Sequence, residues 1–198
     1  MTPAPPRIAV IIGSTREGRL GPAVAGWFVG LAASGAAGDL ALEVIDLREA
    51  GLPEHLAEGH PNRGEYPEAV RPFAARIAAA DGFVLVTPEY NHGYPASLKH
   101  ALDAVGPEWR AKPVAFVSYG GVAGGVRAVE QLRQVVVELH LVPLRDAVTI
   151  PRARRAFAGG AVPADEDGRL ADSVATLVRR LSWWSRALRT ARDSEPYG

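Results

Sequence analysis

The sequence contains no cysteine, one methionine and only two lysines, Lys99 and Lys112. Without cysteine there is no disulfide, no thiolate chemistry and no cysteine-ligated metal. The 22 basic residues balance the 22 acidic ones, so no global field exists to attract nucleic acid or an anionic membrane surface. We therefore expect neither a nucleic-acid partner nor a membrane partner.

Long hydrophobic runs are also missing. No apolar run is long enough to span a bilayer, and Met1 to Pro6 lack the basic and apolar regions of a signal peptide, so we expect a cytoplasmic protein. His55 and His60 are too isolated to suggest a metal site. A chain of 198 residues can bury one substantial core, and no linker or internal repeat is visible. We expect a single domain over residues 1–198.

Short apolar runs alternate with helical patterns along the chain. Strands are expected at Arg7–Gly13, Leu40–Leu47, Phe83–Thr87, Pro113–Tyr119 and Val142–Ile150. Continuous apolar runs of this length are typical of strands buried on both faces, whereas the charges within the last run indicate an edge strand. Strand and helix alternate about five times, which predicts an α/β fold with a doubly wound parallel sheet and helices on both faces.

A helical extension is expected at the C-terminus, from about residue 165. Its helix is predicted over Leu170–Ala191, with an apolar stripe that includes Leu177, Leu181 and Trp184. Such a stripe predicts that this helix packs its apolar side against the rest of the domain.

Right-handed crossovers place every strand-to-helix loop at one edge of such a sheet. If the strand order is 2-1-3-4-5, the first and third strands are neighbours at the topological switch point, where ligands bind in folds of this kind. The fourth strand then flanks them. Three loops would therefore meet at this edge, namely Gly13–Gly21, Pro88–Pro95 and Gly120–Gly125.

The first of these loops has the chemistry of an anion site. It offers Ser14, Thr15, Arg16 and Arg19 just before a helix that starts near Pro22. Hydroxyls, free backbone N–H groups, the positive end of the helix dipole and two guanidiniums all suit a phosphate. The sequence is neither a Walker loop nor a dinucleotide fingerprint. The alternative is an ordinary polar loop with two solvated arginines.

The other two loops suit a flat ligand. Tyr90 and Asn91 combine aromatic surface with polar groups, as a planar heterocycle with carbonyl and N–H edges requires. Ser118–Gly125 is rich in glycine, which lets the backbone approach a ring closely; the alternative is a tight turn that needs positive φ. A phosphate site and a heterocycle site at one sheet edge predict a mononucleotide pocket.

Three segments of the chain resemble a known family. VIIGSTREGRLGPAVAGWF, VLVTPEYNHGYPASLKHALD and PVAFVSYGGVAGGVRAVEQLR are similar to the NAD(P)H-dependent FMN reductases of flavodoxin-like fold, a group that includes quinone, azo-compound and chromate reductases. The similarity runs from about Arg7 to Ile150. It implies a five-stranded sheet with the order 2-1-3-4-5, FMN as the cofactor and NADPH or NADH as the hydride donor.

The resemblance also implies which residues bind FMN. The phosphate would be held by Ser14, Arg16, Arg19 and Leu20. The isoalloxazine and ribityl chain would be lined by Pro88, Glu89, Tyr90 and Asn91. The other side of the site would be closed by Ser118, Tyr119, Gly120 and Gly121. No catalytic side chain is implied, because the cofactor itself carries the hydride chemistry.

The implied function is that of an FMN-dependent NAD(P)H oxidoreductase. It would pass hydride from the nicotinamide to the flavin and then reduce a small acceptor, such as a quinone, a flavin, an azo compound or a metal ion. The resemblance also implies a homodimer or homotetramer. The alternative is a flavodoxin-type electron carrier or flavin-binding regulatory module without turnover. Such carriers are usually strongly acidic, so the neutral charge and the pair Arg16 and Arg19 favour the enzyme.

A short basic cluster follows the last expected strand and consists of Arg152, Arg154 and Arg155. We interpret it as solvated surface, within a stretch to residue 167 that looks irregular. The alternative is that it binds the 2′-phosphate of NADPH.

Overall fold

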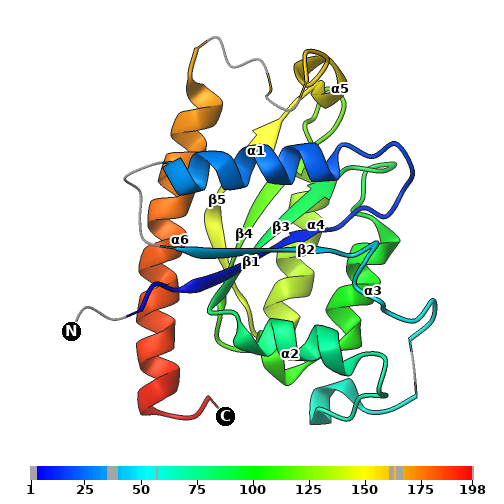
Figure 1. The fold of residues 1–198 in the computed structure, drawn as a ribbon, viewed down its shortest axis with the longest axis vertical. Helices are drawn as coiled ribbons and strands as arrows, with labels where there is room; N and C mark the ends of the chain where they lie inside the picture. Colours follow the sequence, from blue (N-terminus) through cyan, green and yellow to red (C-terminus); the bar gives the residue numbers. More distant parts are fainter. Residues whose placement is uncertain (1–3, 35–39, 57, 161–162, 164–166, 198) are drawn as a thin grey trace.

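The structure, a computed structural model, describes residues 4–34, 40–56, 58–160, 163 and 167–197. Within these residues, five strands form one parallel sheet (Figure 1). They are β1 (Arg7–Ile12), β2 (Ala41–Asp46), β3 (Gly82–Pro88), β4 (Pro113–Tyr119) and β5 (Val142–Ile150). The strands lie in the order β2-β1-β3-β4-β5, and every neighbouring pair is parallel. The predicted fold class and strand order are confirmed.

The burial of each strand follows its place in the sheet. Every residue of β3 and β4 is buried, because each strand has a neighbour on both sides and helices above and below. β5 lies at one edge, as its internal charges predict, and Arg145 on it is exposed. The apolar runs at the centre of the sequence therefore form the centre of the sheet.

Helices cover both faces of the sheet (Figure 1). One face carries α1 (Gly21–Ser34) and α6 (Arg169–Ser194), and the other carries α2 (Arg71–Ala79), α3 (Ala96–Ala104) and α4 (Val126–Glu138). Alternate residues of β1 serve the two layers. Ala9 and Ile11 lie in the core with α2, α3 and α4, whereas Ile8, Val10 and Ile12 lie in the core with α1 and α6. Short helices complete the fold, namely η1 (Pro61–Arg63), η2 (Pro107–Trp109) and α5 (Ala153–Ala156).

The C-terminal helix α6 faces the sheet with small residues as well as with its apolar stripe. Leu177 and Leu181 are fully buried, as the stripe predicts, but the prediction for Trp184 is wrong, because its side chain is 37% exposed. Ser185 is buried instead, and a Cβ added to Gly82 would lie only 2.7 Å from its Oγ. Small residues let α6 approach the start of β3 closely, which turns Trp184 outward. The expected start of this extension, near residue 165, lies outside the described residues.

Asp81 anchors the end of α6. Its carboxylate lies 3.2 Å from both the Arg189 and the Arg192 guanidinium and accepts a 2.9 Å hydrogen bond from the Arg7 backbone N–H. Arg192 also donates to the Ala111 carbonyl at 2.7 Å. These bonds attach the C-terminal helix to the sheet at the amino ends of the strands, where β1 and β3 begin. The strand-to-helix loops lie at the opposite end, where the strands finish.

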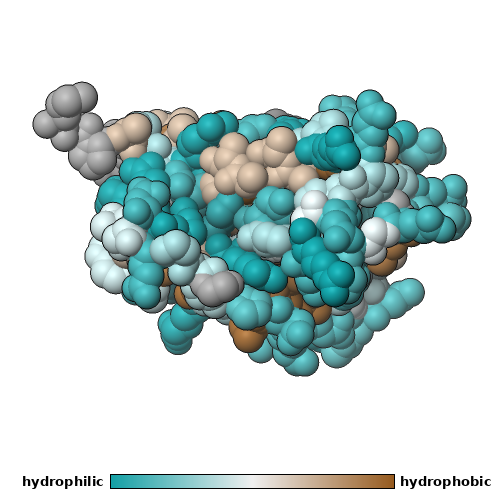
Figure 2. All heavy atoms as spheres, turned by 90° about the horizontal axis from the view of Figure 1, so that it is seen from below, coloured by the Kyte–Doolittle hydropathy of each residue, from teal (hydrophilic) through white to brown (hydrophobic). Residues whose placement is uncertain are grey.

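One face of the molecule carries little continuous apolar area (Figure 2). The face drawn in Figure 2 is predominantly hydrophilic, with small apolar areas between polar and charged side chains. Among the helices that the structure describes, none combines the length and hydrophobicity that crossing a bilayer requires.

Lys112 is a buried cation at the start of β4. Its Nζ donates 2.9 Å hydrogen bonds to the carbonyls of Ile77 and Ala78 and so caps the last turn of α2. The residue is only 6% exposed. Burial, with a smaller contribution from the nearby charge of Arg192, lowers the pKa of Lys112 from 10.5 to about 8.

This lowered pKa predicts how stability depends on pH. Above about pH 8 the folded protein releases the Lys112 proton while the unfolded chain keeps it, so the free energy of unfolding should rise with pH. We expect a gain of about 2 kcal/mol between pH 7.5 and pH 10, measured by urea denaturation. The Lys112→Met variant should lose this gain. Parallel pH profiles for the two proteins would contradict the prediction.

Candidate functional site

The parallel register brings the three predicted loops together at the carboxyl edge of the sheet. Ile12 of β1 pairs with Val86 of β3, and Pro88 of β3 pairs with Tyr119 of β4. The pairing continues beyond the strands, since the Glu89 N–H donates to the Tyr119 carbonyl at 3.1 Å. The starts of the loops are therefore fixed relative to one another by backbone hydrogen bonds.

A cavity of about 530 Å³ opens at this edge. Most of the predicted site residues line it, namely Arg16, Arg19, Leu20, Pro88, Glu89, Tyr90, Tyr119, Gly120 and Gly121. The predicted residues that do not line it are Ser14, Asn91 and Ser118. The remaining lining residues are Glu17, Gly18, Arg152, Ala153, Arg154 and Arg155. The cavity has the size of a small-molecule site.

Tyr90 links the first loop to the second. Its hydroxyl lies 2.6 Å from the Oγ of Ser14, which is fully buried beneath the cavity. The Arg16 guanidinium carbon lies 5.9 Å from the centre of the Tyr90 ring. Arg16 is exposed and forms no ion pair within the described part of the chain, so its donors remain available to a ligand. Ser14 thus acts on the cavity through Tyr90.

Arg19 lines the cavity but already has partners. Its guanidinium donates two hydrogen bonds to the Asp46 carboxylate, at 3.0 and 2.5 Å, and one to the Ser14 carbonyl at 2.7 Å. Asp46 ends β2, directly beside Ile12 in the sheet. The loop sequences do not indicate this partner, because Asp46 lies at the end of the adjacent strand and not in one of the three loops. Arg19 therefore orders the first loop, and its positive charge is balanced by Asp46.

Tyr90 to Gly93 form a tight turn. Tyr90 N–H donates to the Gly93 carbonyl at 2.8 Å, and Gly93 N–H donates back at 3.0 Å. The two central residues, Asn91 and His92, have φ of 48° and 76°, the pattern of a type I′ turn. Both side chains are exposed and neither lines the cavity. The turn directs the Tyr90 side chain, while asparagine tolerates the left-handed conformation.

The carboxylate of Glu89, which lines the cavity, is paired with Arg127. It accepts a 3.2 Å hydrogen bond from the Arg127 backbone N–H, in the first turn of α4, and also pairs with the Arg127 guanidinium. Burial raises the pKa of Glu89, but the hydrogen bonds and charge of Arg127 outweigh it and leave the pKa below its usual value. Glu89 therefore stays ionised near neutral pH and serves the start of α4.

The glycine loop after β4 combines both roles considered for it. Gly124 and Gly125 have φ of 61° and 92°, and a Cβ on Gly125 would lie 2.8 Å from the Cβ of Ser118. This part is a tight turn that packs over Ser118, which is fully buried. Gly120 and Gly121 instead line the cavity, so they present bare backbone to a ligand.

A fourth segment, after β5, completes the wall. The Arg152 N–H donates to the Gly121 carbonyl at 2.7 Å, and the Ala153 N–H donates to the Gly120 carbonyl at 2.9 Å. This pairing places Arg154 and α5 at the cavity, so the interpretation of the cluster as solvated surface in an irregular stretch misses its position in the cavity wall. The signal was its position directly after the fifth strand, whose end lies at the same edge.

The residues present fit a phosphorylated flat ring such as FMN. The Tyr119 hydroxyl is buried in the cavity wall without a hydrogen-bond partner among the described residues, and burial raises the pKa of Tyr119. Glycine backbone and two tyrosine rings offer surface for the ring faces, and Arg16 offers donors for a phosphate. In the described part of the chain, no group of three or more histidine and carboxylate side chains could hold a metal ion.

Comparisons with known proteins identify the family of this chain. The model of the family described as NADPH-dependent FMN reductase matches residues 6–155. An NAD(P)H-dependent FMN reductase of Schizosaccharomyces pombe is 41% identical over 152 residues, which is 74% of each chain. A 2-hydroxy-1,4-benzoquinone reductase of a Burkholderia species is 32% identical over 137 residues, covering 68% of this chain and 67% of its own.

Among solved structures, the flavoenzyme NAD(P)H:(acceptor) oxidoreductase FerB of Paracoccus denitrificans superposes with a TM-score of 0.69 at 26% identity. The match covers 92% of this chain and 98% of FerB. The family model spans all four segments that line the cavity. This chain therefore belongs to the NADPH-dependent FMN reductase family.

Proposed function

We propose that this chain binds FMN in the cavity and uses it to transfer electrons from NADPH or NADH to a small acceptor of the quinone class. The observation that carries the proposal is the meeting of a basic first loop and a glycine-lined wall in one cavity of about 530 Å³. Relatives named as FMN reductases and as a benzoquinone reductase support it.

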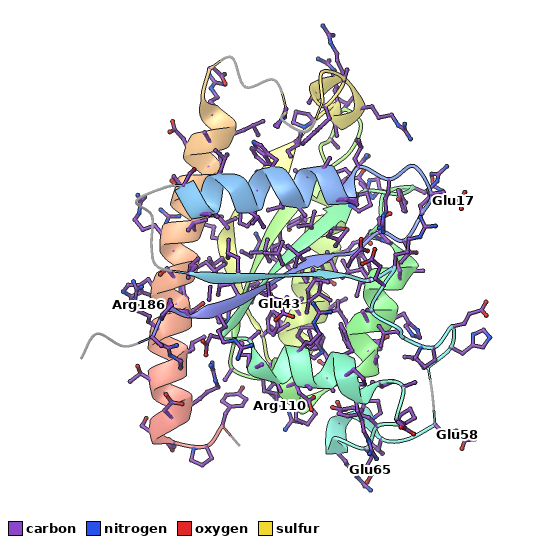
Figure 3. All side chains as sticks on the ribbon, in the orientation of Figure 1. Glu17, Glu43, Glu58, Glu65, Arg110 and Arg186 are labelled. Carbon is purple, nitrogen blue, oxygen red and sulfur yellow. The ribbon has the colours of Figure 1, made fainter. Side chains whose placement is uncertain are left out.

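The first loop would hold the phosphate. Arg16 has free donors, and α1 begins at Gly21, so the positive end of its dipole lies directly after the loop. A phosphate monoester carries about −1.5 to −2 charges at neutral pH and is suited to a guanidinium. Glu17 does not oppose this charge closely, because its side chain is 92% exposed and extends outward from the loop (Figure 3). The ion pair between Arg19 and Asp46 would stabilise the conformation of the first loop.

The ring would lie against Tyr90 and the backbone of Gly120 and Gly121. Bound FMN would supply the hydride and electron-transfer chemistry, and the chain would position it and exclude water from its buried side. We propose no catalytic side chain, because Glu89 is tied to Arg127 and its lowered pKa leaves no proton to exchange near neutral pH.

We also propose a homodimer or homotetramer in the cytoplasm, without a membrane or nucleic-acid partner. Val122, on the loop that follows β4, is 83% exposed, and Val126, the first residue of α4, is 44% exposed. A second copy would cover this apolar surface. The neutral net charge supports the absence of a nucleic-acid partner.

Turnover separates the enzyme from an electron carrier. The purified protein should show flavin absorbance and should oxidise NADPH in the presence of a soluble quinone at a rate well above that of an equal concentration of free FMN. The measurement is the fall in nicotinamide absorbance, with and without quinone. Bound flavin without turnover above the free cofactor would instead identify a carrier or a regulatory module.

Removing the free guanidinium of the first loop should weaken FMN binding. We expect the Kd for FMN of Arg16→Ala to rise about 10- to 100-fold, since one charge-assisted hydrogen bond contributes about 1.5–3 kcal/mol. Titration of the apoprotein with FMN, followed by fluorescence quenching, measures this. Arg179→Ala, which removes an exposed arginine of α6, is the control and should bind as the parent does. Equal Kd values for all three proteins would rule out this role.

Two substitutions of Asn91 test whether its side chain or its backbone matters. Asn91→Gly accepts the φ of 48° without strain, whereas Asn91→Ala does not, so the alanine variant should lose about 1 kcal/mol of stability and bind FMN more weakly. The glycine variant should bind FMN as the parent does. If both variants lost FMN equally, the amide side chain would be a ligand in its own right. Urea denaturation and FMN titration give the two readouts.

A further inference from the structure

The cavity holds more unpaired positive charge than an FMN phosphate requires. Each acidic lining residue has a partner outside the lining: Glu17 pairs with Arg48, and Glu89 pairs with Arg127. Arg19 is balanced by Asp46. Four lining arginines form no ion pair with the described residues, namely Arg16, Arg152, Arg154 and Arg155. A chain of zero net charge thus places around one cavity four guanidiniums that have no carboxylate partner among the residues that the structure describes.

These four arginines come from two places. Arg16 follows β1, whereas Arg152, Arg154 and Arg155 follow β5. Strands β3 and β4 lie between β1 and β5, so the carrying strands are three strand spacings, roughly 14 Å, apart. Two separate anionic groups therefore suit the cavity better than one.

The arginine cluster after β5 is held in a fixed place. Besides its bond to Gly121, the Arg152 carbonyl accepts from the N–H of Arg155 at 2.8 Å and of Ala156 at 3.0 Å. Ala153 and Phe157 are buried in the core with α1 and α6. Arg152 itself has a φ of 48°, a left-handed conformation that non-glycine residues adopt where the surrounding structure holds them. The exposed guanidiniums of the cluster thus project from an ordered backbone.

The hydride donor of the proposed reaction can supply the second anionic group. We propose that Arg152, Arg154 and Arg155 bind the 2′-phosphate of NADPH, and that this cluster makes the chain prefer NADPH to NADH; the proposal rests on the proposed function. Both nucleotides carry a pyrophosphate with one charge on each phosphate, but only NADPH carries a phosphate monoester with nearly two. Three guanidiniums, each able to bind two oxygens, match that group.

The test compares both nucleotides in one variant of the FMN-loaded protein. In Arg154→Ala/Arg155→Ala, the ratio of kcat/KM for NADPH to kcat/KM for NADH should fall about 10- to 100-fold, chiefly through the KM for NADPH. The control Arg63→Ala/Arg179→Ala removes the same charge from exposed residues outside the cavity, so its ratio should stay that of the parent. Arg152 is kept because its backbone shapes the segment.

A binding assay gives a readout that does not need turnover. Calorimetric titration with 2′,5′-ADP should show a 10- to 100-fold loss of affinity in Arg154→Ala/Arg155→Ala, whereas the affinity for 5′-AMP should change far less. An equal loss for NADPH and NADH would assign the cluster to the pyrophosphate or to general attraction of anions, and would overturn the proposal. An unchanged ratio and unchanged 2′,5′-ADP binding would identify a solvated surface.

The same measurements separate this proposal from the proposed function. If the parent bound FMN but oxidised neither nucleotide, the proposed function would fail, and 2′,5′-ADP binding would still decide the role of the cluster. A large loss of FMN affinity in Arg154→Ala/Arg155→Ala would place the cluster in the flavin site and overturn the proposal. If the double variant did not fold, Arg154→Ala and Arg155→Ala alone would answer in the same assays.

Discussion

Parallel pairing of β1, β3 and β4 is the constraint on which the cavity depends. Every strand of this sheet runs in the same direction, so all strand-to-helix loops emerge at one edge. The backbone bonds continue into the loops, where the Gly13 N–H donates to the Val86 carbonyl and the Gly120 N–H donates to the Ile150 carbonyl. A shift in register would change the height of one loop against its neighbours. The relative positions of the loops around the cavity are therefore fixed by the backbone hydrogen bonds between the strands.

Side chains above the ladder then fix the loops to one another. Tyr90 bonds to Ser14 across the switch point, and Ser97 at the start of α3 donates to the Gly13 carbonyl at 2.6 Å. The left-handed turn at Asn91 and His92 is locally unfavourable. It persists because its ends, Tyr90 and Gly93, are hydrogen-bonded to each other and the Tyr90 hydroxyl is bonded to Ser14. Strain of this kind is found where a loop must present a side chain in one orientation.

The sequence predicts whatever depends on local pattern. The apolar runs locate the strands, and the loops after them locate most of the cavity lining, because in a parallel sheet these positions follow from chain order alone. Contacts that depend on tertiary packing cannot be predicted from such patterns. Asp46 reaches Arg19 only because β2 lies beside β1, and Ser185 replaces Trp184 in the interface only because Gly82 lets α6 approach. The spacing of residues along the sequence predicts neither of these two contacts.

The division of charges explains how a neutral chain can serve anionic ligands. Buried or half-buried ion pairs such as Arg19 with Asp46 stabilise the conformation of a loop. They attract a ligand only weakly, because the fields of the two charges largely cancel outside the pair. The guanidiniums of Arg16 and Arg154 form no ion pair with the described residues, so their charges can attract a ligand. The protein walls of the cavity screen these charges less than bulk water does. The net charge of the whole chain therefore does not describe the charge at this cavity. What matters at the cavity is that Arg16 and the cluster after β5 form no ion pair with a carboxylate in the described part of the chain, which suits a ligand with two separated anionic groups.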